Sequence, residues 1–332
     1  MTNFHTQGNF SRLKSSWLVY QEPFYLVFSI ANVFLAITAT LGNILVLIAL
    51  HKVSSIHPPT KLLLRCLAVT DLCVGLVVQP LFIVSLLEIP SETWIDRYRT
   101  GRTFAFILCG VSMLTTAALS VDRLLALLLA LRYRYIVNLR RVRVAIVSFW
   151  LAAISDGLAY SLYSPYIANY VGFVVTLLSL LISVFSYTKI VLKLRVHQVQ
   201  MQHQQDGHEQ AQGGAIKLNI ELYKEILHSI ALLQLAMAVC YFPIVLYLIM
   251  RATTTLALSI TFENSAMTII YFNSSLNPIL YSGKIREVRK EVKNTLKKIC
   301  FFSGWSSPSS GDEGFCHQHR GCVLWVLFNG LE

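Results

Sequence analysis

The feature that most constrains the fold of this chain is a series of seven long apolar segments. An α-helix needs about 20 mostly apolar residues to cross the hydrocarbon core of a bilayer, and each segment is long enough. None shows the strict alternation of apolar and polar residues that membrane β-barrels require. The sequence therefore predicts an all-α membrane protein, a bundle of seven transmembrane helices. The segments are 24–50, 62–87, 102–129, 143–165, 170–195, 226–250 and 259–281.

Composition and charge agree with a membrane location. Hydrophobic residues make up 55% of the chain and charged residues 14%, whereas a soluble domain has about 25% charged residues. With the N-terminus outside, most of the 28 Lys and Arg residues flank the inner ends of the predicted helices, as the positive-inside rule requires. This placement accounts for the net charge of +11 and argues against a nucleic-acid partner. We expect a multi-pass plasma-membrane protein with a cytoplasmic C-terminus.

The membrane domain is predicted at 24–282, preceded by an extracellular N-terminus at 1–23. The first 20 residues show no cleavable signal peptide, and Asn9 begins a glycosylation sequon. Residues 196–216, rich in Gln, His and Gly, predict a long disordered cytoplasmic loop.

Two segments are predicted after the last apolar run. In 283–300, apolar residues recur at helical spacing between Lys and Arg, which predicts a short amphipathic helix on the inner membrane surface. Cys300 at its end is either a palmitoylation site or an unmodified thiol. Residues 301–332 form a cytoplasmic tail, and its serines beside acidic residues suit phosphorylation and arrestin binding, or a plain linker.

Polar residues inside the apolar segments are candidates for function, because each is costly in a membrane. Asn273 and Asn277 are four residues apart and share one helix face. Asp71 and Ser112 are expected to point at that face from the second and third helices. Carboxylate, hydroxyl and amide oxygens would suit a small hard cation. The alternative is a satisfied polar core without an ion.

Short motifs recur along the helices in a fixed order. They are Gly42-Asn43, Leu67-Ala68-Val69-Thr70-Asp71-Leu72, Asp122-Arg123-Leu124, Trp150, Cys240-Tyr241-Phe242-Pro243 and Asn277-Pro278-Ile279-Leu280-Tyr281. In this order and spacing the set resembles the rhodopsin-like (class A) G-protein-coupled receptors, from the first helix through the amphipathic helix. The resemblance implies a non-enzymatic receptor that activates a heterotrimeric G protein, with arrestin and a receptor kinase as further partners.

The resemblance also implies roles for particular residues. Asp71, Ser112, Asn273, Asn277 and Asn43 correspond to a polar core that binds sodium, with no other cofactor expected. In the activation switch, Asp122 restrains Arg123 until Arg123 meets the G protein, and the two prolines kink their helices. Leu131 is a candidate G-protein contact, with a lipid-facing or core role as the alternative. The full switch set is Asp122, Arg123, Tyr187, Tyr241, Pro243, Pro278 and Tyr281.

The chain departs from the family pattern mainly at its outer end. Tyr98 stands where the family has a disulfide cysteine, and the short outer loop at 161–169 has no cysteine. Ser179 replaces the proline of the fifth helix, and Tyr223 replaces the acidic partner of Arg123 on the sixth. We therefore expect raised basal activity. These losses give a weaker resemblance to the group of melanocortin, lysophospholipid, cannabinoid and adenosine receptors.

The ligand pocket expected from the resemblance is mostly apolar. Ala105 replaces the Asp that holds amines, and Tyr271 replaces the Lys that binds retinal, so both ligands are disfavoured. Arg102 either pairs with an anionic headgroup or meets water or lipid phosphate, and Glu263 would suit a basic peptide. A lipid-like or peptide ligand is expected. The predicted lining is Arg102, Ala105, Phe106, Cys109, Val171, Val175, Ile244, Val245, Leu248, Met267 and Tyr271.

Three other functions are alternatives to a receptor. A channel or transporter fits poorly, because the sequence shows neither internal repeats nor pairs of broken helices. An enzyme is disfavoured because the apolar segments contain no metal-ligand spacing and no nucleophile–base pair. A seven-helix scaffold that does not signal is the third alternative.

Overall fold

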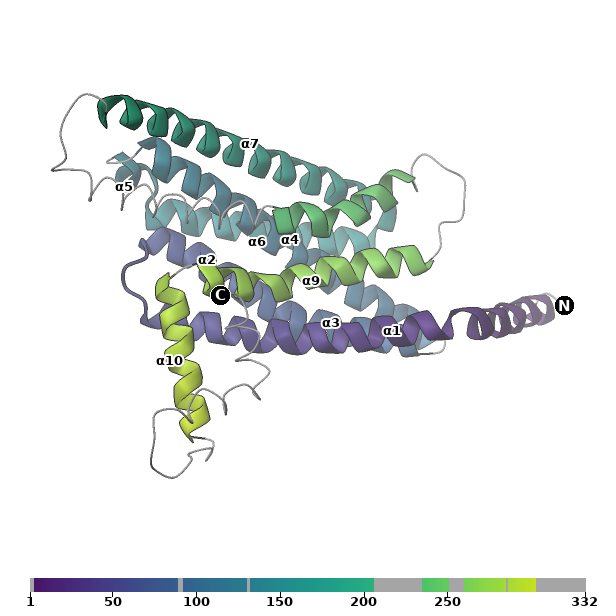
Figure 1. The fold of residues 1–332 in the computed structure, drawn as a ribbon. Helices are drawn as coiled ribbons and strands as arrows, with labels where there is room; N and C mark the ends of the chain where they lie inside the picture. Colours follow the sequence, from purple (N-terminus) through teal and green to yellow (C-terminus); the bar gives the residue numbers. More distant parts are fainter. Residues whose placement is uncertain are drawn as a thin grey trace.

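The chain forms a bundle of long helices (Figure 1). The computed structural model describes residues 3–88, 92–129, 132–205, 235–250, 260–284 and 286–302, and every regular element in these ranges is helical. The elements are α1 (Asn3–Lys52), α2 (Pro58–Cys73), the π-helical turn η1 (Val74–Val78), α3 (Gln79–Leu87), α4 (Glu92–Leu129), α5 (Tyr133–Ile136), α6 (Leu139–Leu162), α7 (Pro165–Gln205), the helix Leu235–Met250, α9 (Ile260–Lys284) and α10 (Arg286–Phe302).

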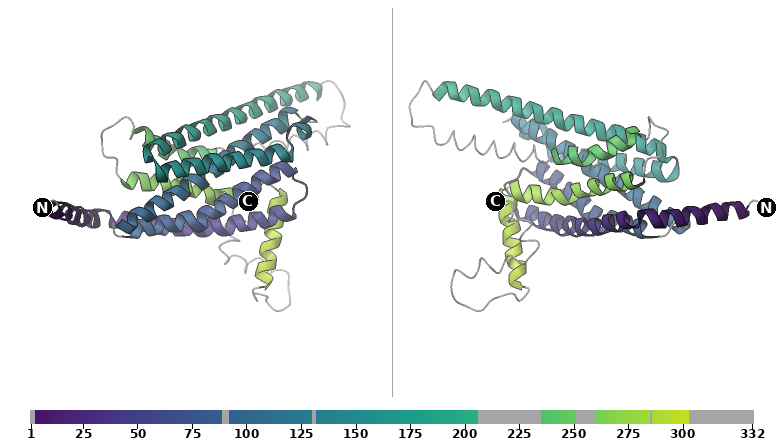
Figure 2. Two further views of the ribbon diagram at one scale, coloured as in Figure 1. Left: turned by 180° about the vertical axis from the view of Figure 1, so that it is seen from behind. Right: turned by 45° about the vertical axis from the view of Figure 1, so that its right-hand side comes forward.

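Most helices run along one common direction, and α4 is the most enclosed of them. It packs against α2, α6 and α7, while α1 packs against α2 and α9. In their most apolar windows, 56% of the α4 residues are buried inside the bundle, compared with 17% in α6. Helix α10 crosses the bundle direction at a steep angle, and the start of α1 projects beyond the opposite end (Figure 2). A residue on α4 can therefore contact several other helices.

Five helical stretches in the described residues are long and apolar enough to cross a membrane: 24–52, 58–87, 93–129, 139–162 and 165–193. The helix Leu235–Met250 is apolar but shorter, and α9 contains Asn264, Asn273 and Asn277 among its apolar residues. Large apolar side chains face outward on several helices; Phe34 is 65%, Leu151 61% and Phe185 58% exposed. Exposed apolar surface on this scale suits contact with lipid.

Several helices extend beyond the apolar segments that predict them. Helix α1 begins at Asn3 and α4 at Glu92, because polar residues continue each helix past its apolar part. Helix α7 continues to Gln205, so residues 196–205, expected in the long loop, are helical instead. That stretch contains neither Gly nor Pro, and its Gln and Met residues favour helix. The rest of the predicted loop lies outside the described residues.

A π-helical turn, η1, joins α2 to α3. The Gln79 amide donates to the Val74 carbonyl five residues back, and Pro80 follows directly. Pro80 has no N–H to offer the carbonyl of Leu76, which disfavours a regular α-helix at this point. Gly75 lets the turn lie close to α1, because a Cβ atom on it would be 2.7 Å from the Thr40 hydroxyl oxygen.

Polar side chains satisfy the backbone groups at several helix ends. The Lys61 ammonium donates to the Val53 carbonyl, and the Arg65 guanidinium to the Leu50 carbonyl (3.2 Å). Asn138 caps the start of α6 by accepting from the Arg141 amide at 2.9 Å. Lys193 on α7 donates to the Leu127 carbonyl at the end of α4, at 2.9 Å. Basic groups at helix C-termini also interact favourably with the helix dipole.

Two large apolar clusters fill most of the described bundle, and a small third one joins Leu124 on α4 to Ile190 on α7. The first joins α1, α2, α4, α5, α6 and α10, and includes Leu50, Leu67 and Tyr133. The second joins η1, α3, α4, α9 and the helix Leu235–Met250, and includes Phe82 and Tyr271. Helix α10 buries Val288, Val292 and Leu296 in the first cluster, so its apolar stripe packs against the bundle.

Candidate functional site

A buried carboxylate lies at the centre of the bundle. Asp71 on α2 is fully buried, and its two oxygens accept hydrogen bonds from different helices. The Ser112 hydroxyl on α4 donates to Oδ1 at 3.0 Å, and the Asn277 amide on α9 donates to Oδ2 at 2.6 Å. Asn273 is buried on α9 as well, and the Ser274 hydroxyl, which the sequence did not single out, also interacts with Asp71. The carboxylate thus ties α2, α4 and α9 together.

Gly42 and Asn43 on α1 lie against the part of α9 that contains Pro278. A Cβ atom on Gly42 would be 2.8 Å from the Cβ atom of Pro278, so only glycine lets the ring approach this closely. Pro278 has no N–H, and the Ser274 carbonyl four residues earlier loses its helical donor. The Asn43 amide donates to that carbonyl at 3.2 Å. Gly42 therefore makes room for the proline ring, and Asn43 replaces the hydrogen bond that the proline cannot donate.

The expected contact between Asp122 and Arg123 is not the one that the structure shows. Asp122 accepts from the Thr60 hydroxyl on α2 at 2.7 Å and from the Tyr133 hydroxyl on α5 at 2.6 Å. Within the described residues, Arg123 forms no ion pair with it. Burial and the hydrogen bond to Asp122 raise the pKa of Tyr133 to about 12, so the phenol keeps its proton. Adjacent residues of a helix point in different directions, so the Arg123 side chain does not face the Asp122 carboxylate.

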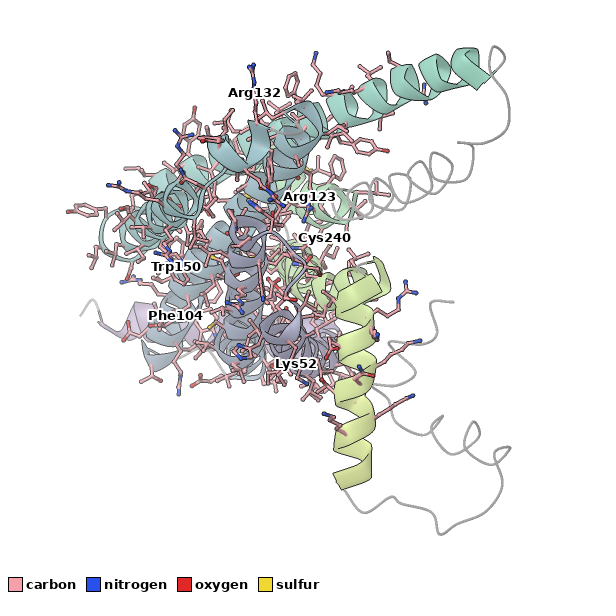
Figure 3. The ribbon with its side chains drawn as sticks, turned by 90° about the vertical axis from the view of Figure 1, so that its left-hand side faces the viewer. Lys52, Phe104, Arg123, Arg132, Trp150 and Cys240 are labelled. Atoms are coloured by element: carbon pink, nitrogen blue, oxygen red, sulfur yellow. The ribbon has the colours of Figure 1, made fainter. Side chains whose placement is uncertain are left out.

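The remaining switch residues are placed at different depths of the bundle. Tyr241 is buried, and its hydroxyl donates to the Cys109 carbonyl on α4 at 3.4 Å. Pro243 lies within the continuous helix Leu235–Met250, and Tyr187 is half-buried on α7. Viewed toward the end that carries α10, Arg123 lies among the helices (Figure 3). Leu131 and the side chains of Tyr281, Asn9 and Cys300 are outside the described residues.

A cavity of about 410 Å³ lies between α4, α6, α7, α9 and the helix Leu235–Met250. Its volume is within the range typical of small-molecule sites. All the predicted pocket residues line it except Val245, which is half-buried away from the cavity because the helix turns it to another face. The wall also includes residues outside the predicted lining, among them the switch residue Tyr241: Gly110, Met113, Leu114, Ser148, Phe149, Ala152, Ala153, Asp156, Asn169, Gly172, Thr176, Tyr241 and Ile270.

Arg102 neither meets water nor faces lipid phosphate, so that interpretation was wrong. Its guanidinium forms an ion pair with the Glu263 carboxylate on α9 at 3.0 Å, and the two side chains are 7% and 14% exposed. The Tyr247 hydroxyl donates to the same carboxylate at 2.8 Å, and the Tyr98 hydroxyl at 3.4 Å. Ordinary helical spacing places Arg102 one turn from Ala105, but sequence alone could not show that Glu263 faces it from α9.

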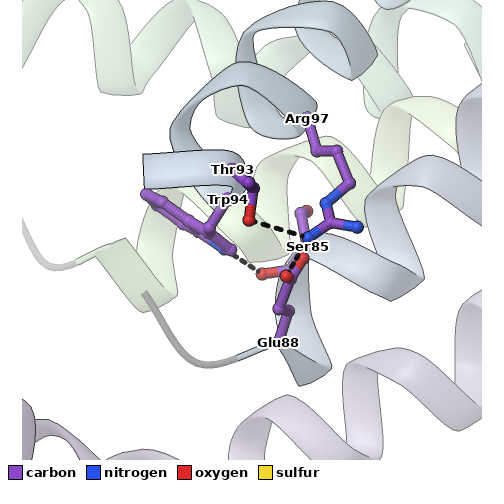
Figure 4. A network of polar contacts seen from close by, with 5 residues as sticks. All are labelled: Ser85, Glu88, Thr93, Trp94 and Arg97. Carbon is purple, nitrogen blue, oxygen red and sulfur yellow. Dashed lines mark hydrogen bonds and ion pairs between the residues drawn. The ribbon is translucent and has the colours of Figure 1, made fainter. Parts of the chain in front are cut away.

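The connection between α3 and α4 is held by polar contacts near the position where the family has its disulfide (Figure 4). Arg97 forms an ion pair with Glu88 and donates to the Thr93 hydroxyl at 3.1 Å. The Trp94 indole donates to the Ser85 carbonyl at 2.8 Å and stacks on Tyr98. The cysteines that the structure describes, Cys66, Cys73, Cys109 and Cys240, are free thiols. Noncovalent contacts therefore close this end of the bundle.

Comparison with known families identifies the class of protein. The profile of the 7 transmembrane receptor (rhodopsin family) matches residues 42–166 and 158–281, well over half of the chain. This protein therefore belongs to the rhodopsin family of receptors. The match covers α2 through α9 and includes Asp71, Arg123 and Pro278.

Two curated relatives are melanocortin receptors. Melanocortin receptor 5 of Rattus norvegicus is 25% identical over 279 residues, covering 79% of this chain and 82% of the relative. Melanocortin receptor 5 of Mus musculus is 25% identical over 291 residues, covering 82% and 84%. The protein is thus a membrane receptor of the rhodopsin family, with distant similarity to these melanocortin receptors.

Proposed function

We propose that this receptor has seven membrane-crossing helices and converts the binding of an extracellular ligand into activation of a heterotrimeric G protein. The observation that carries the proposal is that α4 connects three sites. Arg102 and Cys109 line the cavity, Ser112 meets Asp71 in the polar core, and Arg123 lies near the helix end. At 1.5 Å per residue, Arg102 and Arg123 are separated by about 30 Å. One helix therefore runs from the candidate ligand site to the candidate G-protein site.

The proposed orientation places the cavity toward the outside and Arg123 toward the cytoplasm. Most of the Lys and Arg residues, including those exposed on α10, then lie on the cytoplasmic side, as the positive-inside rule requires. Helix α10 lies across the end of the bundle (Figure 1), a position that suits a helix on the inner membrane surface. The N-terminus is extracellular in this arrangement, and the C-terminal tail is available to a receptor kinase and arrestin.

The coupling mechanism starts at the cavity wall. A ligand there contacts Tyr241, whose hydroxyl holds the helix Leu235–Met250 to the α4 backbone. Loss of that contact lets this helix move at Pro243, while α9 can adjust at Pro278. The hydrogen bonds of Asp71 connect α9 with α4 and transmit the change. Arg123, which is not paired with Asp122, then engages the G protein.

A sodium ion is a candidate occupant of the polar core. The donor set consists of hard oxygens, which suits an alkali cation, and the side-chain oxygen of nearby Asn43 accepts no hydrogen bond from the described residues. Asp71 and Ser112 would hold the ion, with Asn273 and Asn277 supplying amide oxygens. Its positive charge would offset the buried carboxylate and stabilise the ligand-free state.

Replacement of Arg123 tests the proposed function. We expect Arg123→Ala to abolish G-protein activation in cells while surface expression is retained, because the G protein loses its guanidinium contact. Arg99→Ala is the matched control, since Arg99 is exposed on the other half of α4. Full coupling by Arg123→Ala, or no coupling by either wild type or control across G-protein classes, would argue instead for a scaffold or transporter.

Ligand-free signalling provides a second measurement. The chain lacks the family disulfide cysteine at Tyr98, and Asp122 is bonded to Tyr133 rather than to Arg123. Both features weaken restraint of the resting state, so we expect raised basal activity compared with an empty-vector control. A receptor that is silent without ligand at equal surface expression would contradict this expectation. The ligand itself is proposed to be lipid-like or peptide, because the cavity is mostly apolar.

A further inference from the structure

Asp156 is a carboxylate in the wall of the cavity that the proposed mechanism does not use. It lies in the second half of α6 and lines the cavity together with residues of α4 and α7. Its Oδ1 atom is buried and accepts no hydrogen bond from the described residues. A buried carboxylate oxygen without a donor is costly, and native proteins rarely keep one without a reason.

The charge of the cavity lining depends on Asp156. The other charged residue in the described lining is Arg102, and Glu263 already neutralises it across a distance of 3.0 Å. The Glu263 carboxylate also accepts from Tyr98 and Tyr247, while the Arg102 Nε–H has no acceptor among the described residues. The uncompensated charge that a ligand would meet is therefore negative.

The surroundings of Asp156 leave room for a cation. Gly172 on α7 faces the carboxylate; a Cβ atom there would be 3.6 Å from Oδ2 of Asp156 and 3.2 Å from the Phe106 ring. The Phe106 ring lies beside this space; the Tyr160 ring packs behind it with a centroid distance of 4.9 Å, and the Arg102 guanidinium carbon is 5.8 Å from the Phe106 centroid. Aromatic rings attract organic cations as well as apolar groups. The carboxylate, the small residue and the rings together form a candidate subsite.

We propose that the cavity binds a small amphipathic organic cation, whose ammonium group pairs with Asp156 while its apolar body fills the space toward Met267 and Tyr271. This inference rests on the proposed receptor function and replaces the lipid-like or peptide ligand suggested by the apolar lining with a cation, because Asp156 adds a negative charge to that lining. The absence of an acidic residue at Ala105 removes the ammonium partner from the third helix of the family. Asp156 supplies one to the same cavity from α6.

A matched set of three probes tests the proposal directly. They are 4-phenylbutylamine, 4-phenylbutan-1-ol and 4-phenylbutanoic acid, which share one apolar body and differ in charge. Binding is measured from the concentration dependence of thermal stabilisation, using the full-length receptor in nanodiscs of uncharged phosphatidylcholine at neutral pH. We expect the amine to half-saturate at a concentration about tenfold or more below that of the alcohol, since charge-assisted hydrogen bonds are strong. Equal binding of amine and alcohol, or tightest binding of the acid, would overturn the proposal.

Three variants test whether the tighter binding of the amine depends on the subsite at Asp156. Asp156→Asn keeps the shape of the side chain and should remove the amine's advantage while leaving alcohol binding unchanged, which also shows that the variant is folded. Gly172→Ala keeps the carboxylate but narrows the space beside it, and should weaken amine binding more than alcohol binding. Asp96→Asn removes the same charge from an exposed position on α4 and should bind all three probes like wild type. An undiminished amine advantage in both cavity variants would contradict the assignment.

The binding assay contains no G protein, so it is independent of the coupling test. Arg123→Ala protein should bind 4-phenylbutylamine like wild type. A receptor that couples to G protein but shows no amine preference would overturn the ligand class alone. Amine binding without coupling would overturn the proposed signalling function instead.

Discussion

At the scale of single residues, some helix contacts in the bundle depend on the size of one side chain. Gly42 is such a position, because Pro278 occupies the space that a side chain would take. Asn43 beside it supplies the hydrogen bond that the proline removes from the Ser274 carbonyl. The polar core at Asp71 lies close to this contact through Ser274. Packing and hydrogen bonding are thus coupled within a few residues.

We predict that Gly42→Ala destabilises the receptor by about 1–3 kcal/mol, the usual cost of overpacking. The added Cβ atom would lie 2.8 Å from the Pro278 ring, and neither helix can yield without disturbing the other. Thermal unfolding of the purified protein measures the effect. Gly101→Ala is the control, since its Cβ atom would be 3.4 Å from Leu81 and alanine favours helix. Equal stability of the two variants would show that α1 and α9 separate at little cost.

At the scale of elements, the shortest helix in the described residues is anchored by one buried side chain of its own. Helix α5 is four residues long and is too short to be stable alone. Tyr133 anchors it by donating to Asp122 and by packing in the first apolar cluster. Because Asp122 belongs to α4 and Thr60 to α2, the same hydrogen-bond group fixes α5 against two membrane-crossing helices.

We predict that Tyr133→Phe lowers the stability of α5 by about 1.5–3 kcal/mol, the range for a hydrogen bond to a charged group. The ring stays buried, so the loss is that of the hydroxyl alone. Hydrogen exchange of the backbone amides in 133–137 measures local opening. Tyr135→Phe in the same helix is the control, because Tyr135 is 89% exposed. Identical exchange rates in the two variants would mean that packing alone holds α5.

The elements themselves were predictable because length and apolar character decide which segments cross a membrane. Five of the seven predicted segments have helices that meet those criteria, and the core residues Asp71, Ser112 and Asn277 meet as their helix faces suggested. Helix ends were less predictable, since polar residues such as those after Val196 extend a helix without an apolar signal. Asp156 was overlooked although it is an acidic residue in an apolar segment. The pairing of Arg102 with Glu263 depends on how α4 meets α9, which spacing along one helix cannot reveal.

At the scale of the whole molecule, one end of the bundle is closed by noncovalent contacts. The buried Arg102–Glu263 pair joins α4 to α9, and the more exposed Arg97–Glu88 pair joins α4 to α3. These two pairs should differ in energetic weight, because a buried charge that loses its partner is strongly unfavourable whereas an exposed one is solvated. The buried pair is therefore the main electrostatic contact across this end.

We predict that Arg102→Met or Glu263→Met alone destabilises the receptor by about 3–5 kcal/mol, and that the double variant recovers most of the loss. Each single change leaves one charge buried without a partner, and the double change leaves none. Arg97→Met, which breaks the exposed pair, should cost at most about 1 kcal/mol. Thermal unfolding of the wild type, the variants Arg102→Met and Glu263→Met and their double variant gives the coupling energy. Additive losses in the double variant would show that Arg102 and Glu263 act independently.

The π-helical turn η1 has a consequence for how this chain can change over evolutionary time. In sequence terms it behaves as a one-residue insertion, because it fits five residues where a regular helix would advance with fewer. A regular α-helix through the same residues, without the turn, would rotate the side chains of α3 by about 100° about the helix axis. Phe82 would then leave the Tyr271 ring that it meets edge-on at 5.3 Å. A relative that lacks the turn would therefore present the same face of α3 only with one residue fewer in this stretch, and its comparison with this chain needs a one-residue gap at this point.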